Sequence, residues 1–328
     1  MTRISENQSS RVLISNTLEN KRKVGLFSEQ LASGYKVALP GDSNQSGTVS
    51  QYRQSLEKIE SYTTTIAQTK SFLQYQDDTI QQVNDILVRA KEVAAQAANE
   101  TNSNISRAQL SEEIFQIRDH LVNLANSTFQ GKYVWGGAAD NIPPYIAQTY
   151  TTPATGPASQ RYVIDAQPGR DTLRTVQITD NLSLQVNSTA ASIFDRAIQA
   201  AERIGRALGG FSTTLTAGVP DGGGVAYVFP TDFSAQTQAI KDGMNLLDSA
   251  REGDIIPERV EIGGKLRRIE TGESLLTLEK ASSQEVLSRI QDADEAETAT
   301  SLQQAQNALQ ASYTVTARVL RLSIIDYI

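Results

Sequence analysis

The stretch YRQSLEKIESYTTTIAQTKSFLQYQDDTIQQVNDILVRAKEVAAQA, residues 52–97, decides the fold of this chain. Steps of seven residues meet an apolar side chain each time, at Tyr52, Ile59, Ile66, Leu73, Ile80, Leu87 and Ala94. A second stripe joins at the companion spacing, at Val83, Ala90 and Ala97. Such a repeat keeps one face of a helix against a partner helix over many turns. We therefore predict a helix about 70 Å long, at about 1.5 Å per residue, which needs neighbours to cover its apolar stripe.

Two other regions repeat apolar residues at helical spacing and predict the partners of this helix. The first follows an unbroken four-three rhythm, at Leu110, Ile114, Ile117, Leu121 and Leu124. The second is another seven-residue ladder, interrupted only at Ser283, with members Ile255, Ile262, Ile269, Leu276 and Ile290. Glycines at 263, 264 and 272 weaken the prediction of a helix over 258–290, because each costs about 1 kcal/mol inside a helix.

Shorter helical patterns predict helices at 191–208 and 232–250, and a last helix at 294–325. The last helix carries its apolar residues at Leu302, Ala305, Leu309, Val319 and Leu322.

The middle of the chain has a different composition. Residues 131–189 contain five prolines among Thr, Tyr and Gly, at Pro143, Pro144, Pro153, Pro157 and Pro168. Apolar residues alternate over 176–178 and 182–186, on either side of Asp180 and Asn181. That pattern predicts a short antiparallel hairpin. The glycine-rich stretch 209–224 predicts a loop.

These elements give a mainly α fold class: a long antiparallel helical rod, a coiled-coil-like bundle, with a small β-rich inserted outer domain. The rod comprises residues 46–130 and 190–289, and the insert comprises residues 131–189. We expect the insert at the far tip and both termini together at the other end. The predicted rod-core seam consists of Ile59, Ile66, Leu73, Ile80, Leu87, Ile114, Ile117, Leu121, Leu124, Ile262, Ile269 and Leu276.

Terminal segments 1–45 and 290–328 are rich in polar residues and poor in aromatic ones. We predict that they are helical when assembled and largely disordered in the free monomer, because they offer little apolar surface against about 1–2 kcal/mol per residue of ordering entropy. Neighbouring subunits would supply the missing surface. The residues predicted to act in this terminal assembly helix are Leu302, Leu309, Val319, Leu322 and Ile325.

Composition excludes several kinds of site. The chain has no cysteine and one histidine, which excludes disulfides, thiolate zinc sites and multi-histidine metal sites. A net charge of −7 argues against nucleic acid as the main partner. The amino terminus has no apolar core typical of a signal peptide, and no run reaches the roughly 18 apolar residues of a membrane span. We therefore expect no membrane insertion and no cleaved signal.

Three polar patterns are better explained without chemistry. His120 beside Asp119 lacks an organised serine. Asp292 and Asp294 are two residues apart on a predicted helix, so they point about 200° apart and do not converge on a metal. Gly263-Gly264-Lys265 lacks the other residues of a phosphate loop. For Trp135 and Tyr133 we favour packing at the turn between rod and insert over a subunit contact. We predict no enzyme activity and no cofactor.

Four segments resemble the flagellin superfamily, in the order in which that family carries them. They are EQLASGYKV at 29–37, QYQDDTIQQVNDILVRAKEVAAQAAN at 74–99, RAQLSEEIFQIRDHLVNLANSTFQGKYVWGG at 107–137 and SRIQDADEAETATSLQQAQNALQASY at 288–313. RVEIGGKLRRIE at 259–270 is similar to the family's return helix. The ending LSIIDYI, the turn GKYVWGG and the segment SIFDRAI at 192–198 resemble the hook–filament junction branch more than filament flagellins. The family's paired acids are reduced to Asp42 here.

The resemblance implies an extracellular, axial subunit of the bacterial flagellum that joins hook to filament. It also implies export through the flagellar type III apparatus with an export chaperone, and self-association in a ring or helical array. The implied neighbours are hook-associated protein 1 and flagellin. Two alternatives stay open: a filament flagellin and, because heptads alone permit it, an intracellular coiled-coil scaffold.

Overall fold

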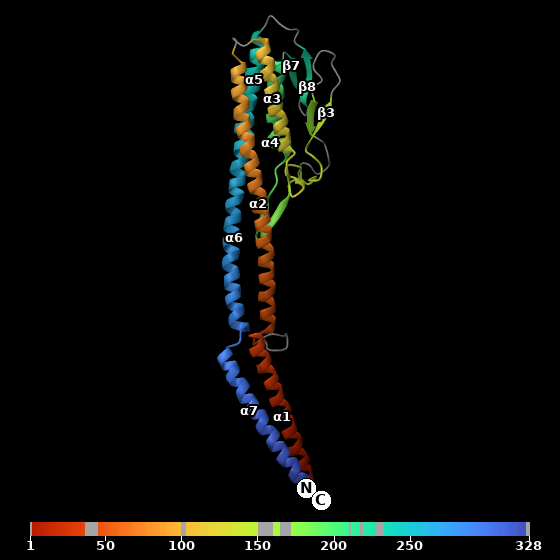
Figure 1. Cartoon of the computed structure of the whole chain (residues 1–328), viewed down its shortest axis with the longest axis vertical. Coiled ribbons are helices and arrows are strands. Elements are labelled where there is room, and N and C mark those ends of the chain that lie inside the picture. Colours follow the sequence, from red (N-terminus) through yellow and green to blue (C-terminus); the bar gives the residue numbers. More distant parts are fainter. Residues whose placement is uncertain are drawn as a thin grey trace. The chain divides into compact units, whose positions relative to one another are not determined.

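The computed structural model describes residues 2–36, 45–99, 103–149, 160–164, 172–209, 211–216, 219–226 and 233–325. The chain divides into two compact units. The terminal unit comprises residues 1–61 and 276–328, and the central unit comprises residues 62–275. The fold is mainly α, as the heptads predict (Figure 1). The long helices are α1 (Thr2–Ser33), α2 (Ser46–Ala97), α6 (Ile256–Gln291) and α7 (Glu295–Ile325).

Three shorter helices form a bundle in the central unit: α3 (Asn104–Ala125), α4 (Ala190–Leu208) and α5 (Phe233–Ala250). Helix α4 packs against both of the others, and 13 of its 19 residues are buried. Side-chain caps set where two of these helices begin. Ser103 accepts a hydrogen bond from the Ser106 amide, and Thr189 accepts one from the Ser192 amide, which satisfies amide groups left open in the first turn.

Helix α5 continues into α6 through one π-helical turn, η1 (Arg251–Ile255). Pro257 follows this turn within the first residues of α6. Proline has no amide hydrogen to donate to the carbonyl four residues earlier, and a π-turn is a known way to absorb such an irregularity. The glycines of the predicted helix 258–290 do not interrupt it.

Helix α2 runs antiparallel to the continuous stretch formed by α5, η1 and α6 in the central unit, and the polar pairs between them show it. Four α2 residues spaced by seven, Lys70, Asp77, Asn84 and Lys91, contact Glu273, Arg259, Arg251 and Asp248 in that order. The contact distances lie between 2.6 and 3.3 Å. These pairs flank the heptad stripe of α2, so the seven-residue period organises polar contacts as well as apolar ones. Exposed pairs contribute only about 0.2–1 kcal/mol each. These pairs therefore define the register between the helices more than they add to the stability of the fold.

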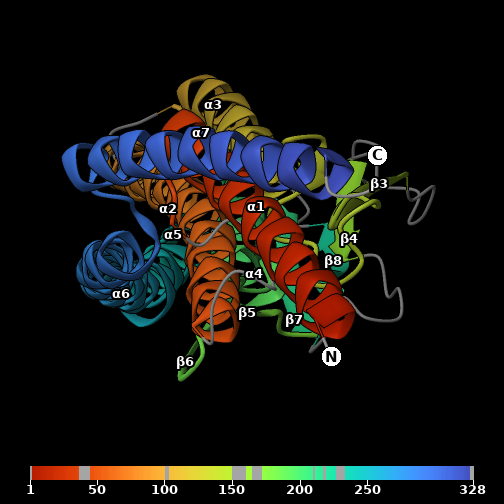
Figure 2. The ribbon, with the colours of Figure 1, turned by 90° about the horizontal axis from the view of Figure 1, so that it is seen from below.

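Among the residues that the structure describes, eight short strands form four antiparallel hairpins. The strands are β1 (Thr128–Phe129), β2 (Lys132–Tyr133), β3 (Tyr145–Thr149), β4 (Gln160–Ile164), β5 (Thr175–Thr179), β6 (Leu182–Gln185), β7 (Phe211–Thr216) and β8 (Val219–Ala226). An isolated two-stranded hairpin is marginal in water, so these hairpins need helices to pack on. In Figure 2, β4, β7 and β8 lie on the other side of α4 from α6.

The predicted hairpin around Asp180 is confirmed as β5 and β6. It is held to the helices of the central unit. Tyr62 of α2 donates a hydrogen bond to the Asp180 carboxylate at 2.7 Å. A Cβ added to Gly272 of α6 would lie 3.2 Å from Ile178 Cγ2, so the glycine lets the hairpin approach the helix closely. The glycine that weakened the helix prediction therefore has a packing role.

The prediction of a loop at 209–224 is wrong, because this stretch contributes most of the β7–β8 hairpin. Its glycines and proline mark turns by local propensity, whereas the hairpin is made by pairing between strands and carries two irregularities of register. The β structure of the chain therefore extends beyond the predicted insert at 131–189.

Trp135 lies where the chain leaves the helices for the hairpins. Its side chain is fully buried and its ring meets that of Phe194 edge to face, with centroids 5.5 Å apart. The elbow-packing interpretation of Trp135 is thus confirmed, and Tyr133 beside it is half-buried. Among the described helices, none combines the length and apolarity needed to cross a membrane.

Candidate assembly interface

The terminal unit brings the two ends of the chain together as a pair of helices. Helix α1 packs along α7 (Figure 1). The pairing begins where each helix meets its connection. The Lys36 amide donates to the Gln291 carbonyl, and the Ala293 amide donates to the Gly34 carbonyl, both at 2.8 Å. Gly34 has a φ of 75°, a conformation that glycine adopts without strain, so it ends α1 in a turn that can form this bridge.

Further along the pair α1 and α7 stay in contact, but few of their described side chains are buried. Asn20 donates a hydrogen bond to Ser312 Oγ at 2.7 Å. None of the described α1 side chains, at 11–33, is buried, and among those of α7, at 295–318, only Thr298 and Ala305 are. A helix in contact with one neighbour can cover only one narrow stripe of its surface. The pair therefore has no closed core within the part of the chain described.

Large apolar side chains are exposed along both helices of this pair. Val12 is 54% exposed, Leu18 is 62% exposed and Tyr313 is 52% exposed. The other exposed members of this set are Ile14, Leu26, Leu31, Tyr35 and Val315. Burial of a side chain of this size is worth about 1.5–3 kcal/mol, and a rim of exposed apolar groups this long is typical of a surface that meets another protein. The α1–α7 pair is the candidate assembly interface.

Most of the predicted seam residues are buried. The buried members are Ile59, Ile66, Leu73, Ile80, Leu87, Ile114, Leu121, Ile262, Ile269 and Leu276. Ile117 and Leu124 are only half-buried, because α3 turns a partly polar face toward α4. Of the predicted assembly residues, Leu302 and Leu309 are half-buried on α7. The backbones of Val319, Leu322 and Ile325 belong to α7, and their side chains lie outside the described set.

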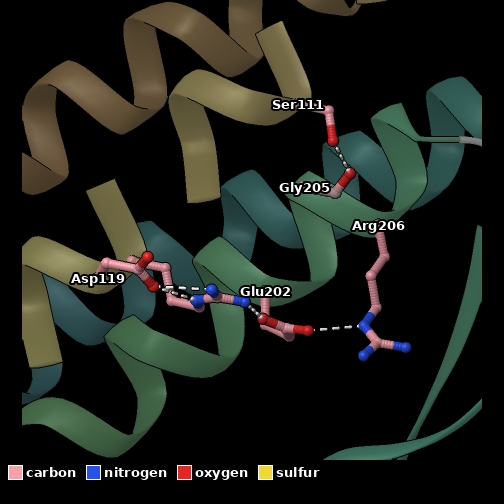
Figure 3. A network of polar contacts seen from close by, with 6 residues as sticks. Ser111, Asp119, Glu202, Gly205 and Arg206 are labelled. Atoms are coloured by element: carbon pink, nitrogen blue, oxygen red, sulfur yellow. Dashed lines mark hydrogen bonds and ion pairs between the residues drawn. The ribbon is translucent and has the colours of Figure 1, made fainter. Parts of the chain in front are cut away.

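A buried polar network between α3 and α4 replaces the apolar contact expected there (Figure 3). The Arg118 guanidinium of α3 donates to the Glu202 carboxylate of α4 at 2.5 Å and to Asp119 at 2.7 Å. Arg206 donates to the other oxygen of Glu202 at 2.6 Å. Burial by itself lowers the pKa of Arg118, but the charges and hydrogen bonds of Glu202 and Asp119 raise it above the ordinary value. The network links α3 to α4 through paired charges, and removal of one partner would leave another buried charge uncompensated.

The same two helices come close together one turn away from this network. Ser111 donates a hydrogen bond to the Gly205 carbonyl at 2.6 Å, a contact drawn in Figure 3. A Cβ at Gly205 would lie 2.8 Å from Phe115 Cε1. Gly205 therefore permits an approach that any larger residue would force apart.

Two half-buried carboxyl groups of the central unit lack a full set of compensating charges. Burial raises the pKa of Asp195, although the hydrogen bond that Tyr145 donates at 3.0 Å lowers it in part. Burial likewise raises the pKa of Glu258, against the opposing effects of the Ser188 hydrogen bond and the Lys265 charge. Each group lies where a hairpin connection meets a helix, so both belong to packing.

None of the three polar patterns set aside in the sequence forms a site. His120 is exposed, and Asp119 is engaged by Arg118. Asp294 accepts hydrogen bonds from the Ala296 and Glu297 amides at the start of α7. Lys265 is buried and pairs with Glu261 at 2.8 Å. The described residues contain no cluster of three or more side chains able to hold a metal ion.

The ends of the chain match two protein families. The family described as the bacterial flagellin N-terminal helical region matches residues 4–139, and the bacterial flagellin C-terminal helical region matches residues 244–328. Together these matches cover most of the chain and leave out the part that holds most of the hairpins.

Individual proteins extend the similarity. Flagellar hook-associated protein 3 of Escherichia coli (strain K12) is 26% identical over 299 residues, which are 88% of this chain and 87% of that protein. Flagellin FlaB1 of Treponema pallidum (strain Nichols) is 30% identical over 106 residues, which are 32% of this chain and 37% of that protein. The crystal structure of hook-associated protein 3 from Legionella pneumophila has the same fold, with a TM-score of 0.59 and 14% identity over 74% of this chain and 98% of that one.

Proposed function

This chain belongs to the flagellin superfamily and has a structural role in the bacterial flagellum, and from that premise we propose that it joins the hook to the filament. The observation that carries the proposal is the extent of the similarity to a hook-associated protein 3. That similarity spans 299 residues, so it includes the hairpin-bearing middle of the chain. The hairpins would be the part in which a junction subunit differs from a filament subunit.

We further propose that joining works through the α1–α7 pair. Its exposed apolar residues would be covered by α1 and α7 of neighbouring subunits in a ring or helical array. Such contacts must be heterologous, one patch meeting a different patch, because only these propagate instead of closing as a dimer. Hook-associated protein 1 would be the neighbour on the hook side, and flagellin would be the neighbour on the filament side.

Segments 1–45 and 290–328 would be largely disordered before assembly, because the α1–α7 pair buries too little to offset the entropy of ordering it. Ordering and assembly then become one event, typical of segments that fold on binding. A chain with loose ends would also suit export through the flagellar type III apparatus with a chaperone, without a cleaved signal.

Filament flagellin is the second candidate. The similarity to flagellin FlaB1 favours it, and both functions use the same terminal helices. The intracellular scaffold loses its support, because the relatives are flagellar proteins. Nothing in the comparisons points to an enzyme.

A strain that lacks this chain separates the two candidates. Loss of a junction subunit should leave hooks without filaments while flagellin accumulates in the medium. Loss of a filament subunit should remove flagellin both from the cells and from the medium. Electron microscopy of the cells and immunoblots of the medium measure the two outcomes, and hooks that still carry filaments would contradict the proposal.

A further inference from the structure

Helix α6 is apolar on two opposite faces within the central unit. One face buries Ile262 and Ile269. On the other, Ile256 is 43% exposed and Val260 is 67% exposed. At about 100° per residue, positions 256, 260, 263 and 267 lie within roughly 60° of one another, so they form one stripe. Large exposed apolar side chains gathered on one helix face are typical of a surface that meets another protein.

A groove lies along this stripe. It has a volume of about 430 Å³, and the residues that line it include Ile255, Val260 and Gly263. A Cβ added to Gly263 or Gly264 would meet nothing within 4 Å. Two adjacent glycines in the middle of a helix cost it about 1 kcal/mol each, and no close contact within the described chain accounts for them. Their effect is an open notch where another backbone can come near.

Three arginines line the groove, and one of them, Arg259, is paired with Asp77. Arg251, Arg259 and Arg267 line it, and none of its lining residues is acidic. Arg251 is oriented by Asn84 at 2.9 Å and Arg259 by Asp77 at 3.1 Å. Arg267 is exposed on the same face. A partner for this groove should therefore combine apolar and acidic side chains.

The chain itself carries a segment of matching charge, in which Ala293 and Ala296 are the apolar residues. Residues 292–297 hold four acids and no base: Asp292, Asp294, Glu295 and Glu297. All four are exposed in the terminal unit. Asp294 caps α7, which leaves Glu295 of the first turn to face a partner, whereas Glu297 points about 200° away from Glu295.

We propose that the α6 groove binds residues 292–297 of a second copy of this chain. The inference rests on the self-association put forward above and names one of its contacts. The groove and the acidic segment are different patches, so the contact is heterologous and can propagate from copy to copy. The apolar residues that line the groove would be covered by the bound segment, and the arginines that line it would favour an acidic segment.

Site-specific cross-linking tests this docking directly, because the chain has no cysteine of its own. Full-length Val260→Cys and Glu295→Cys copies are expressed together in a strain that lacks the natural chain, and assembled flagella are oxidised. We expect a disulfide-linked dimer on non-reducing gels only when both variants are present. A dimer from Val260→Cys alone would overturn the proposal, because the groove would then face another groove.

Two neighbouring arginines provide a matched pair of variants. Arg267 lines the groove, whereas Arg268 points about 100° away from it. In the cross-linking background, Arg267→Glu should lower the dimer yield about twofold to fivefold, as expected for an exposed charge pair. Arg268→Glu carries the same change of charge and should leave the yield unchanged. Equal losses for both variants would contradict a role for the groove.

A bulky side chain in the notch tests its shape. Gly263→Leu should lower the dimer yield at least about tenfold, because the side chain would occupy the notch at a site where overpacking cannot relax. Its own fold has room for the change, and circular dichroism of the monomer confirms that the helix is kept. An unchanged yield would overturn the proposal.

Filament growth in the same strains separates this inference from the junction function. Filaments on hooks without a 260–295 dimer would refute the docking and leave the junction function standing. Hooks that carry filaments in the absence of any copy of this chain would refute the junction function itself, and the dimer assay would still decide the docking.

Discussion

The α1–α7 pair and the α3–α4 pair are both made of two helices distant in sequence, yet they close their contacts in different ways. The α3–α4 pair buries Ile114, Leu121 and Phe194 around a fully paired ionic network. The α1–α7 pair, by contrast, leaves Val12, Leu18 and Tyr313 about half exposed or more. The first pair is complete within one chain. The second has the composition of a core that lacks its other half, as the proposed self-association would require.

The largest expected effect on stability comes from a change in the α3–α4 pair, which is complete within one chain. Glu202→Ala would leave Arg118 and Arg206 buried without their shared carboxylate, which should lower the free energy of unfolding by about 3–5 kcal/mol. Urea denaturation of the monomer, followed by circular dichroism, measures it. The neighbouring Arg203→Ala removes a partly exposed pair with Asp242 and should cost less than about 1 kcal/mol. Equal losses would show that burial of the network does not matter.

A smaller effect on stability is expected from two glycines, one that lies against a neighbouring helix and one that faces open space. A Cβ at Gly243 of α5 would collide with Ile204 of α4, so Gly243→Ala should destabilise the monomer by about 1–3 kcal/mol. Gly263→Ala meets open space and should stabilise it by up to about 1 kcal/mol through helix propensity. Thermal unfolding of both variants measures the difference in sign. A stabilised Gly243→Ala would mean that α4 and α5 do not pack tightly.

The half-buried carboxyl of Asp195 predicts that the stability of the central unit depends on pH. Because burial raises the pKa of Asp195 in the folded state, the folded chain binds a proton more tightly than the unfolded chain. The resulting stabilisation is present in acid and is lost as the pH rises from the ordinary aspartate value through the raised one. Asp195→Asn keeps an acceptor for the Tyr145 hydroxyl.

In stability measurements at a series of pH values, Asp195→Asn should therefore flatten this fall and raise stability at neutral pH. Exposed Glu112→Gln removes one carboxylate at the surface and serves as the control for the change of charge. A stability that rises with pH more steeply in the natural chain than in Asp195→Asn would contradict the assignment.

The smallest effect on stability is expected in the open pair. Leu18→Ser on α1 should change the free energy of unfolding of the monomer by less than about 0.5 kcal/mol, because the side chain is already exposed. The same change should impair filament attachment in cells, since it removes apolar surface from the assembly interface. Asn16→Ser alters an exposed polar neighbour and should affect neither. A large loss of monomer stability from Leu18→Ser would mean that α1 is buried within one chain.

Sequence periodicity was sufficient for the helices and insufficient for what lies between them. The seven-residue steps from Ile59 to Leu87 predict α2 because heptad spacing is a local property of the chain. The α3 rhythm predicts the helix correctly but places Ile117 and Leu124 deeper than they are. Its buried face also includes Arg118 and Ser111, and hydrophobicity patterns count such residues as exposed.

The polar network could not be predicted because its partners are far apart in the chain. Arg118 and Glu202 are separated by 84 residues, and nothing local indicates that they meet. One signal was available: Glu202 and Arg206, four residues apart, lie on the apolar face of α4. The β7–β8 hairpin was missed for a related reason, since strand pairing outweighs the turn propensity of its glycines.

Hydrogen exchange followed by mass spectrometry, on the monomer and on assembled flagella, tests the central claim most directly. The account predicts that amides at 11–33 and 295–318 exchange rapidly in the monomer and are strongly protected after assembly, while those of α3 and α4 are protected in both. Equal and strong protection of α1 and α7 in the free monomer would contradict it.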